Sequence, residues 1–434
     1  MINLRKFLLL LGDAFLLYFS LFLALFLRFF KNFSFSFFIS HLLPFSILYF
    51  FWLVILYAFG FYDLYLIKDK ISFYSRFLGV ILINLVAGVI FFYSITLFGI
   101  TPKTNLVLVA VIFGILFMVW RNFFYLLFSS YFLNKVAIIG QGEEIENLKK
   151  EIRERPYLGY KLVPVNLKEE LLPQIEKENI DTIIFTEDFE SDPKFLKALY
   201  FCLPAKVTFL DFVKAYELIT EKIPISMVSK AWFLENLKER EKNFYDKIKR
   251  IIDLFLAILF LILSFLLWPI IALAIKLEDS GPIFYTQERV GKDRKKFILY
   301  KFRSMIAGAE KGGPRWAEKE DQRITKVGKF LRETHLDEIP QMINVIKGNL
   351  SLVGPRPERP EFVEKLEKEI DHYSLRYLIK PGFTGWAQIK FRYSRSIKDS
   401  YEKFQYDLYY IKNRSFLLDV GILLKTFQLF FKRE

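Results

Sequence analysis

The 434-residue sequence is poor in cysteine and contains only one, Cys202. A single thiol cannot form a disulfide framework within the chain. Nor can it supply the several thiolates of a cysteine-built zinc site or an iron–sulfur cluster. We also expect no cleavable signal peptide at the start of the chain. These absences exclude a disulfide scaffold and cysteine-ligated metal chemistry.

Apolar residues, by contrast, are abundant: 53% of the chain is hydrophobic, and 50 residues are Phe. Soluble domains average about 45–50% apolar, so the excess points to a membrane. Because 25% of the residues are charged, part of the chain must nevertheless be soluble. Four apolar runs of about 20 residues, the length needed to cross a bilayer, occupy 7–27, 42–61, 77–98 and 106–128. We predict four membrane-spanning helices, in which Asp13 and Arg121 snorkel to the headgroups and have no assigned role.

The charge distribution predicts the orientation of these helices. Basic residues are more frequent on the side that carries both ends of the four-helix unit, including Arg5, Lys6 and Lys135. This bias places both ends in the cytoplasm. Residues 242–434 carry 36 Lys and Arg against 24 Asp and Glu, net +12, whereas residues 1–241 carry only +2. We expect an anionic partner for the basic segment, and the spanning bundle offers a surface for possible homo-oligomerisation.

A fifth apolar run at 254–275 is long enough to span, but Pro269 interrupts it. A proline inside a helix removes a hydrogen bond and bends the axis. Basic residues flank both ends of the run, so both flanks favour the cytoplasm. We predict a re-entrant helix over 251–276 that breaks near Trp268 and Pro269 and returns to the same face.

The segment after Asn134 has the alternating pattern of a small parallel α/β sheet. Strands are expected at 135–139, 182–186 and 206–210, with a helix at 143–155. The turn Gly140-Gln141-Gly142 begins a dinucleotide fingerprint, but Ile145 stands where its third glycine is required. We favour a Rossmann-like scaffold over a cofactor site. The alternative is a membrane-anchored NAD-dependent sugar nucleotide dehydratase or epimerase, which needs a Tyr and a Lys four residues apart. Tyr157 with Lys161, and Tyr245 with Lys249, have that spacing but unsuitable locations.

The basic C-terminal segment contains unusual strings rich in Arg, Pro and Gly. Asp337 and Glu338 are adjacent, and on a helix they would point about 100° apart, so they cannot act as a facing acid/base pair. One can be a nucleophile or a Mg²⁺ ligand while the other tunes it. Arg356 stands between two prolines that fix the backbone around its planar fork. The strings are KFRSM at 301–305, THLDEIPQMINVIKGNLSLVGPRPERPEF at 334–362 and KPGFTGWAQ at 380–388.

In their order, these strings resemble the bacterial polyprenyl-phosphate sugar-1-phosphate transferases, the monotopic phosphoglycosyl transferase superfamily. The resemblance covers about 245–434, and the first 240 residues resemble the extension of the long members. It implies three parts: a transmembrane bundle (1–133), a Rossmann-like cytoplasmic domain similar to CoA-binding domains (134–240), and a mixed α/β monotopic catalytic domain (241–434). The implied location is the cytoplasmic face of a bacterial inner membrane, where glycan assembly begins.

The implied reaction is ping-pong. Asp337 attacks a nucleotide diphosphate sugar, taken to be a UDP-hexose, and polyprenyl (undecaprenyl) phosphate then accepts the sugar phosphate. Glu338 is implied as the catalytic partner, and Mg²⁺, with Asp337 as its ligand, offsets the diphosphate charge. Implied substrate-binding residues are Arg332 and Arg356, with Lys301, Arg303 and Arg392 as further candidates.

Two departures from the family pattern concern the sugar site and the break of the re-entrant helix. Lys390-Phe391-Arg392 replaces the common Asn-Gly-Arg, and Ser264 lies five residues before Pro269 instead of adjacent to it. A basic domain could also bind nucleic acid electrostatically. That hypothesis does not require the carboxylate pair, and we predict no nucleic-acid partner.

Overall fold

The computed structural model describes residues 2–31, 33–62, 70–94, 103–130, 133–155, 158–167, 170–186, 192–309, 321–391 and 396–431. The chain divides into two compact units, Met1–Ala215 and Tyr216–Glu434. The division falls before the predicted limit at residue 240. Ile223, Ile225 and Phe233 are buried in the same apolar core as Val345 and Phe404, so the segment after Ala215 belongs to the C-terminal unit.

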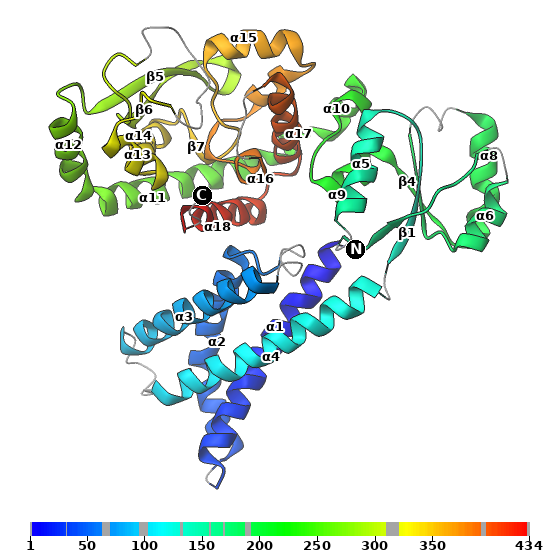
Figure 1. Ribbon diagram of the computed structural model, residues 1–434, viewed down its shortest axis with the longest axis horizontal. Coiled ribbons are helices and arrows are strands. Elements are labelled where there is room, and N and C mark those ends of the chain that lie inside the picture. The colour runs from blue at the N-terminus through cyan, green and yellow to red at the C-terminus, as the bar shows by residue number, and fades with distance from the viewer. Residues whose placement is uncertain are drawn as a thin grey trace. The chain divides into compact units, whose positions relative to one another are not determined.

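Four long apolar helices open the chain, as predicted. Each contains a stretch of 18 to 24 residues with mean hydropathy between 2.0 and 2.3, enough to cross a membrane. Large aromatic side chains fill the space between them, and Phe77 stacks on Phe117 with ring centroids 4.3 Å apart. The helices are α1 (Ile2–Phe29), α2 (Phe35–Ala58), α3 (Lys70–Ser94) and α4 (Lys103–Ser130), drawn in blue to cyan in Figure 1.

Asp13 and Arg121, which lie inside these helices, form a buried ion pair. Nη2 of Arg121 in α4 lies 2.6 Å from Oδ2 of Asp13 in α1, and both residues are almost completely buried. The expectation that they snorkel to the headgroups is therefore wrong. Each charge neutralises the other inside the bundle, and this lowers the free-energy cost of burying the two side chains.

A four-stranded parallel sheet follows the bundle, in the order β2-β1-β3-β4. This confirms the predicted small parallel sheet, and the sequence pattern missed only the short β2. Helices α6 (Leu171–Glu178) and α8 (Pro193–Phe201) bury apolar residues against one face of the sheet, and α5 (Glu143–Glu154) lies on the other face (Figure 1). The strands are β1 (Asn134–Ile139), β2 (Tyr160–Leu162), β3 (Thr182–Phe185) and β4 (Thr208–Asp211).

The glycine turn between β1 and α5 is closely packed. Gly140 has φ +146°, and a Cβ there would lie 2.7 Å from Cδ1 of Ile145, so only glycine fits. Ile145 is fully buried and fills the space beside the turn. The packing therefore assigns a structural role to Gly140, whereas a Cβ at Gly142 would meet no other atom within 4 Å.

The C-terminal unit is a mixed α/β body. An antiparallel hairpin of β5 (Phe284–Val290) and β6 (Lys296–Phe302) lies apart from a short parallel pair, β7 (Ser351–Val353) and β8 (Gly382–Thr384). Helices surround both pairs, and α17 runs through the core with Phe404 and Ile411 fully buried. The helices are α13 (Lys326–Glu333), α14 (Gln341–Lys347), α15 (Pro360–Glu369), α16 (Trp386–Lys390), α17 (Ile397–Asn413) and α18 (Phe416–Phe431).

The fifth apolar run forms two helices, α11 (Asn243–Ser264) and α12 (Leu267–Glu278), bent by 61°. The break lies at Phe265 and Leu266, close to its predicted place near Trp268 and Pro269. A proline ring clashes with the carbonyl four residues before it, which here belongs to Phe265, but it fits the first turn of a new helix. The chain therefore breaks ahead of Pro269 and restarts with the proline inside.

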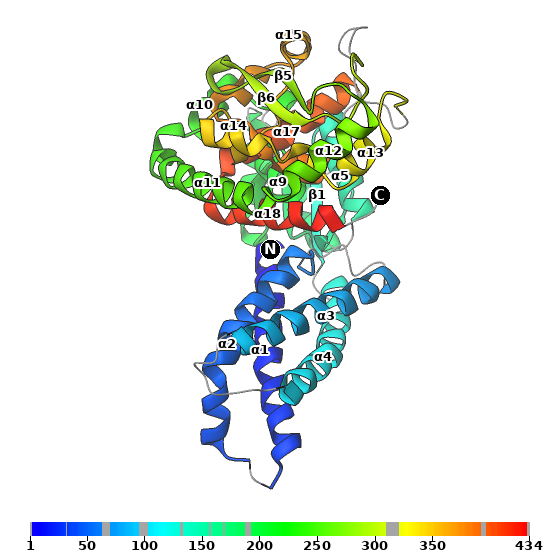
Figure 2. The ribbon, with the colours of Figure 1, turned by 90° about the vertical axis from the view of Figure 1, so that its left-hand side faces the viewer.

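Both ends of this broken pair attach to the same body. On α11, Arg250 donates to the carbonyls of Val345 and Ile346 at the end of α14, at 2.6 and 2.8 Å. On α12, Glu278 accepts from the first two backbone amides of α13. Helix α18 lies beside α11 (Figure 2), held by Lys249 and Asp419 at 2.7 Å. Both ends of the pair are therefore bound to one body, an arrangement that is compatible with the predicted re-entrant path.

Candidate active site

The adjacent acids Asp337 and Glu338 lie in a short connection between two helices. Helix α13 is capped by the Thr325 side chain and ends at Glu333, and His335 then reverses the backbone with φ +53°. A single 3-10 turn, η8 (Leu336–Glu338), carries the two acids. A 3-10 turn separates successive side chains by about 120°, so the carboxylates point apart, as the helical prediction also required.

The turn is supported by the second half of the broken helix pair. Leu336 packs against the cluster formed by Ile271 and Ile275 of α12 together with Phe302 and Leu331. Asp337 is buried, with 6% of its surface exposed. The second half of the broken helix pair therefore helps to fix the carboxylate of Asp337.

Lys301 on β6 bridges the two acids. Its Nζ lies 2.6 Å from Oε1 of Glu338 and 4.0 Å from Oδ2 of Asp337. The buried side chain of Asn344 holds β6 against α14, because it accepts from the amide of Tyr300 at 3.1 Å and donates to the carbonyl of Ile298 at 2.6 Å. This cross-link sets the distance between Lys301 and the acidic turn.

Arg356, between its two prolines, contacts the same acid from the opposite loop. Its Nη2 lies 3.3 Å from Oε1 of Glu338, and its Nη1 donates to Oε1 of Gln388 at 3.0 Å. Buried Arg376 donates to the carbonyl of Arg356 at 3.0 Å and is itself paired with Asp407 at 2.9 Å. The arginine fork is thus held at both its backbone and its side chain.

The sequence analysis did not select Gln388 or Arg376. Gln388 ends the string KPGFTGWAQ, so a signal for it was present. Arg376 lies in no recognised string, and the partners that connect it to the site, Arg356 and Asp407, are 20 and 31 positions away along the chain. No local pattern could have identified it.

The remaining predicted arginines differ in their placement. Nε of Arg332 donates to Ser304 Oγ at 2.8 Å, and its positive charge acts on Asp337. Arg303 instead faces Asp279, at 2.7 Å from its carbonyl oxygen and 3.5 Å from Oδ2, and supports the turn after α12. Arg392 lies outside the described residues. The structure therefore brings Lys301, Arg332 and Arg356 to the acidic pair, and directs Arg303 elsewhere.

The two carboxylates have opposite electrostatic environments. Burial raises the pKa of Asp337 above its ordinary value, against the charge of Lys301, and the charge of Glu338 adds to the increase. Burial also acts to raise the pKa of Glu338, but the charges of Lys301 and Arg356 outweigh it and hold that pKa well below its usual range. Glu338 therefore stays ionised and paired with two cations, whereas Asp337 is the more basic carboxylate.

The donor set fits a Mg²⁺ ion that shares its coordination with a substrate. Within the described ranges, no cluster of three or more His, Cys, Asp and Glu side chains could hold a metal by itself. Mg²⁺ commonly takes one or two carboxylates and completes its shell with phosphate oxygens and water. Because Glu338 is engaged by Lys301 and Arg356, Asp337 is the available ligand.

The Tyr and Lys pairs considered for a dehydratase do not form a catalytic dyad in the described residues. Both Tyr245 and Lys249 are bound to Asp419, at 2.6 and 2.7 Å. Burial and the charge of Asp419 raise the pKa of Tyr245, the reverse of what a tyrosine base requires. Tyr157 lies outside the described residues.

Comparison with known proteins matches residues 244–433 to the family described as bacterial sugar transferase. The chain is 44% identical over 182 residues to the UDP-N-acetylgalactosamine-undecaprenyl-phosphate N-acetylgalactosaminephosphotransferase of Aeromonas hydrophila, covering 42% of this chain and 43% of that protein. It is 46% identical over 152 residues to a putative undecaprenyl-phosphate N-acetylgalactosaminyl 1-phosphate transferase of Bacillus subtilis (strain 168), covering 34% of this chain and 79% of that protein.

A third relative is the UDP-glucose:undecaprenyl-phosphate glucose-1-phosphate transferase of Escherichia coli (strain K12). The two chains are 42% identical over 181 residues, which cover 41% of this chain and 39% of that protein. The chain thus matches less than half the length of the Aeromonas and Escherichia proteins.

Proposed function

The chain belongs to the bacterial sugar transferase family, and we propose that it transfers a sugar 1-phosphate from a UDP-hexose to polyprenyl phosphate, which starts assembly of a membrane-bound glycan. The names of the relatives support this proposal, because they include undecaprenyl phosphate as acceptor and UDP-glucose or UDP-N-acetylgalactosamine as donor. The observation that carries the chemistry is the electrostatic difference between two adjacent carboxylates. We place the reaction on the cytoplasmic face of the bacterial inner membrane, a proposal that the broken apolar helix pair and its basic flanks support.

The first half of the reaction uses Asp337 as nucleophile. A carboxylate with a raised pKa is the better nucleophile, and burial protects it from water. Its oxygen attacks the β-phosphorus of the nucleotide sugar, the bond from that phosphorus to the bridging oxygen breaks, and UMP leaves with the electron pair. The sugar phosphate is then bound to Asp337 as an acyl phosphate.

Lys301, Arg332 and Arg356 oppose the negative charge that accumulates on the diphosphate. Arg356 presents a planar fork that suits two phosphate oxygens. Glu338 keeps Lys301 and Arg356 in place and ionised beside the reacting phosphorus. Bound at Asp337, a Mg²⁺ ion would neutralise diphosphate charge.

The second half regenerates the enzyme. A phosphate oxygen of the polyprenyl phosphate attacks the phosphorus of the intermediate, and the bond to Asp337 breaks. The products are the polyprenyl diphosphate sugar and a free carboxylate. Because the same atom of Asp337 forms and loses the bond, one carboxylate is sufficient for both halves.

The test uses purified full-length protein and a panel of UDP-sugars without acceptor. We expect one equivalent of UMP to be released with the correct donor, together with a sugar-phosphate adduct that mass spectrometry locates on the peptide containing Asp337. The variant Asp337→Asn should form no adduct and should lose more than about 10⁴-fold in turnover. The matched control Asp371→Asn, at an exposed acid outside the site, should behave as wild type.

Two results would contradict the scheme. If UMP appears only when polyprenyl phosphate is present, the reaction is a direct displacement. If Asp337→Asn turns over at the wild-type rate, or if the adduct maps to another residue, Asp337 is not the nucleophile. Failure with every UDP-sugar and success with another nucleotide sugar would correct only the donor.

A further inference from the structure

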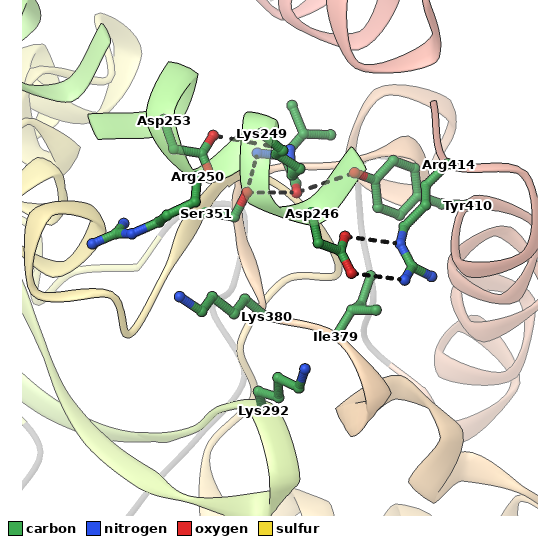
Figure 3. A pocket seen from close by; sticks show the side chains of 11 residues that line it. Asp246, Lys249, Arg250, Asp253, Lys292, Ser351, Ile379, Lys380, Tyr410 and Arg414 are labelled. Atoms are coloured by element: carbon green, nitrogen blue, oxygen red, sulfur yellow. Dashed lines mark hydrogen bonds and ion pairs between the residues drawn. The ribbon is translucent and has the colours of Figure 1, made fainter. Parts of the chain in front are cut away.

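A second group of basic residues lies at the opposite end of α14 from the catalytic turn. Together with Lys249 and Arg414, the residues Arg250, Lys292 and Lys380 line a cavity of about 100 Å³ beneath the N-terminal half of α11. We call it the basic pocket (Figure 3). Asp337 and Glu338 do not line it, and the seven residues of α14 separate its two ends by about 10 Å.

The acids in and around the basic pocket are already paired. Arg414 lies 3.3 Å from Asp246 and 2.6 Å from Glu239. Lys249 lies 2.7 Å from Asp419 and 3.9 Å from Asp253. Asp253 also accepts from a backbone amide. These contacts leave little carboxylate charge for the other cations of the pocket.

Three cations therefore share one space without an acidic partner in direct contact, within the part of the chain that the structure describes. Arg250 donates only to backbone carbonyls, and neither Lys292 nor Lys380 makes an ion pair with a described residue. A Cβ at Gly348 would lie 3.4 Å from Nη2 of Arg250 and 3.5 Å from Nζ of Lys380. The glycine, with φ +83°, keeps the space between these two charges open.

The mutual repulsion of these charges is visible at Lys380. Burial lowers the pKa of its ammonium, and the charges of Arg250 and Lys292 lower it further, with only partial relief from Asp253 and Asp246. Without a bound anion, the repulsion between the three cations raises the free energy of the folded state. A compact anion with several oxygens would remove the cost and accept hydrogen bonds from all three side chains.

The position of the basic pocket on α11 points to a lipid as the source of that anion. Arg250 lies one turn before the apolar run, and Ile251 and Phe255, which follow it on the same helix, are 67% and 66% exposed. Leu417 on the adjacent α18 is 86% exposed. Basic residues directly beside a membrane-inserted segment lie at the depth of the phospholipid headgroups.

We propose that the basic pocket binds the phosphate of a membrane phospholipid, held by Arg250, Lys292 and Lys380. The bound lipid takes no part in the reaction. It fixes the start of the broken helix pair at the bilayer surface, and α14 connects this anchor to the turn that carries Asp337.

The test titrates full-length protein in an uncharged detergent with dihexanoyl phosphatidylglycerol while the unfolding midpoint is followed. We expect the phospholipid to raise the midpoint of the wild type. Dihexanoylglycerol, which lacks the phosphate, and inorganic phosphate should not do so at the same concentration. The variants Lys292→Gln and Lys380→Gln should each need about fivefold more phospholipid for the same increase, and the double variant about 25-fold more.

The matched control is Lys295→Gln, which removes the same charge from the same hairpin turn but outside the pocket. It should respond as wild type. Without lipid, Lys380→Gln should unfold no earlier than the wild type, because the change removes a repelled cation. This second measurement separates loss of binding from loss of folding.

Several results would overturn the proposal. An unchanged response in the double variant means that the pocket is not the binding site. An equal effect of dihexanoylglycerol means that the acyl chains alone bind, and an equal effect of inorganic phosphate means that a free anion is the ligand. Farnesyl phosphate that acts at tenfold lower concentration than the phospholipid, and depends on the same lysines, would identify an acceptor site instead.

Discussion

The Nζ of Lys301 lies 2.6 Å from Oε1 of Glu338. The same ammonium is 4.0 Å from Asp337, so the lysine is bound to one acid of the pair and only neighbours the other. Arg356 reinforces this asymmetry, because it also contacts Glu338. Two adjacent residues of the same charge therefore have different chemical properties, and the first three predictions follow from this difference.

The pH dependence of turnover should reflect the raised pKa of Asp337. The proposed nucleophile must be ionised, so the rate should fall as the pH falls through a pKa that lies above the usual value of 3.8. The pH dependence of folding stability has the opposite sign. A raised folded-state pKa favours the folded state at low pH, and this contribution is lost as the pH rises through that pKa. Asp337→Asn should then be at least as stable as the wild type at neutral pH, and a clear fall in its unfolding midpoint would contradict the assignment.

Glu338→Gln should lower turnover by about 100-fold, since Lys301 and Arg356 lose the charge that orients them. The change should also move the acid limb of the pH profile to lower pH, because the charge of Glu338 contributes to the raised pKa of Asp337. Glu333→Gln, at an exposed acid on α13, is the control. A slower variant whose acid limb does not move would show that the two carboxylates are not coupled.

Arg356→Lys keeps the charge but loses the fork that reaches Glu338 and Gln388 together. We expect KM for the nucleotide sugar to rise by roughly 10- to 100-fold, the cost of a charged hydrogen bond. Arg359→Lys, three residues along the same loop, should change KM by less than about twofold. Steady-state kinetics at saturating acceptor measures both variants. Equal effects at the two positions would indicate a general charge requirement and no specific phosphate contact.

The broken helix pair should leave both of its flanks on one side of the membrane. In a Cys202→Ser background, Lys247→Cys and Lys295→Cys should react with a membrane-impermeant thiol reagent only from the cytoplasmic side. Lys31→Cys, between α1 and α2, should react from the opposite side. Labelling of Lys247→Cys and Lys295→Cys from different sides would require a full span.

The start of the C-terminal unit predicts where a truncated chain can begin. A chain of residues 216–434 should retain transfer activity in lipid or detergent. A chain of residues 241–434 lacks the buried side chains of Ile223, Ile225 and Phe233, and burial of each contributes about 1.5–3 kcal/mol. It should therefore unfold at a lower temperature, as calorimetry would show. Loss of chemistry from a folded 216–434 chain would assign a catalytic contribution to the N-terminal unit.

The sequence by itself determined the segments whose signal is local. Twenty apolar residues define a span wherever they occur, so the four N-terminal helices could be predicted. Alternating strands and helices after Asn134 defined the parallel sheet. The strings around Asp337 and Arg356 identified the family, because their residues are close along the chain.

Only the tertiary structure decided which charges meet. Asp13 and Arg121 are 108 positions apart, and neither sequence environment reveals that they form a buried pair. Lys301 and Arg303 are equivalent in the sequence pattern, yet one binds Glu338 and the other Asp279, because β6 ends at Phe302 and Arg303 lies beyond the strand. An ion pair depends on the distance between two groups in space, and the packing of the whole unit determines that distance. Apolar runs and turn residues, by contrast, form local structure with residues that are adjacent in the chain. The sequence alone therefore predicts them.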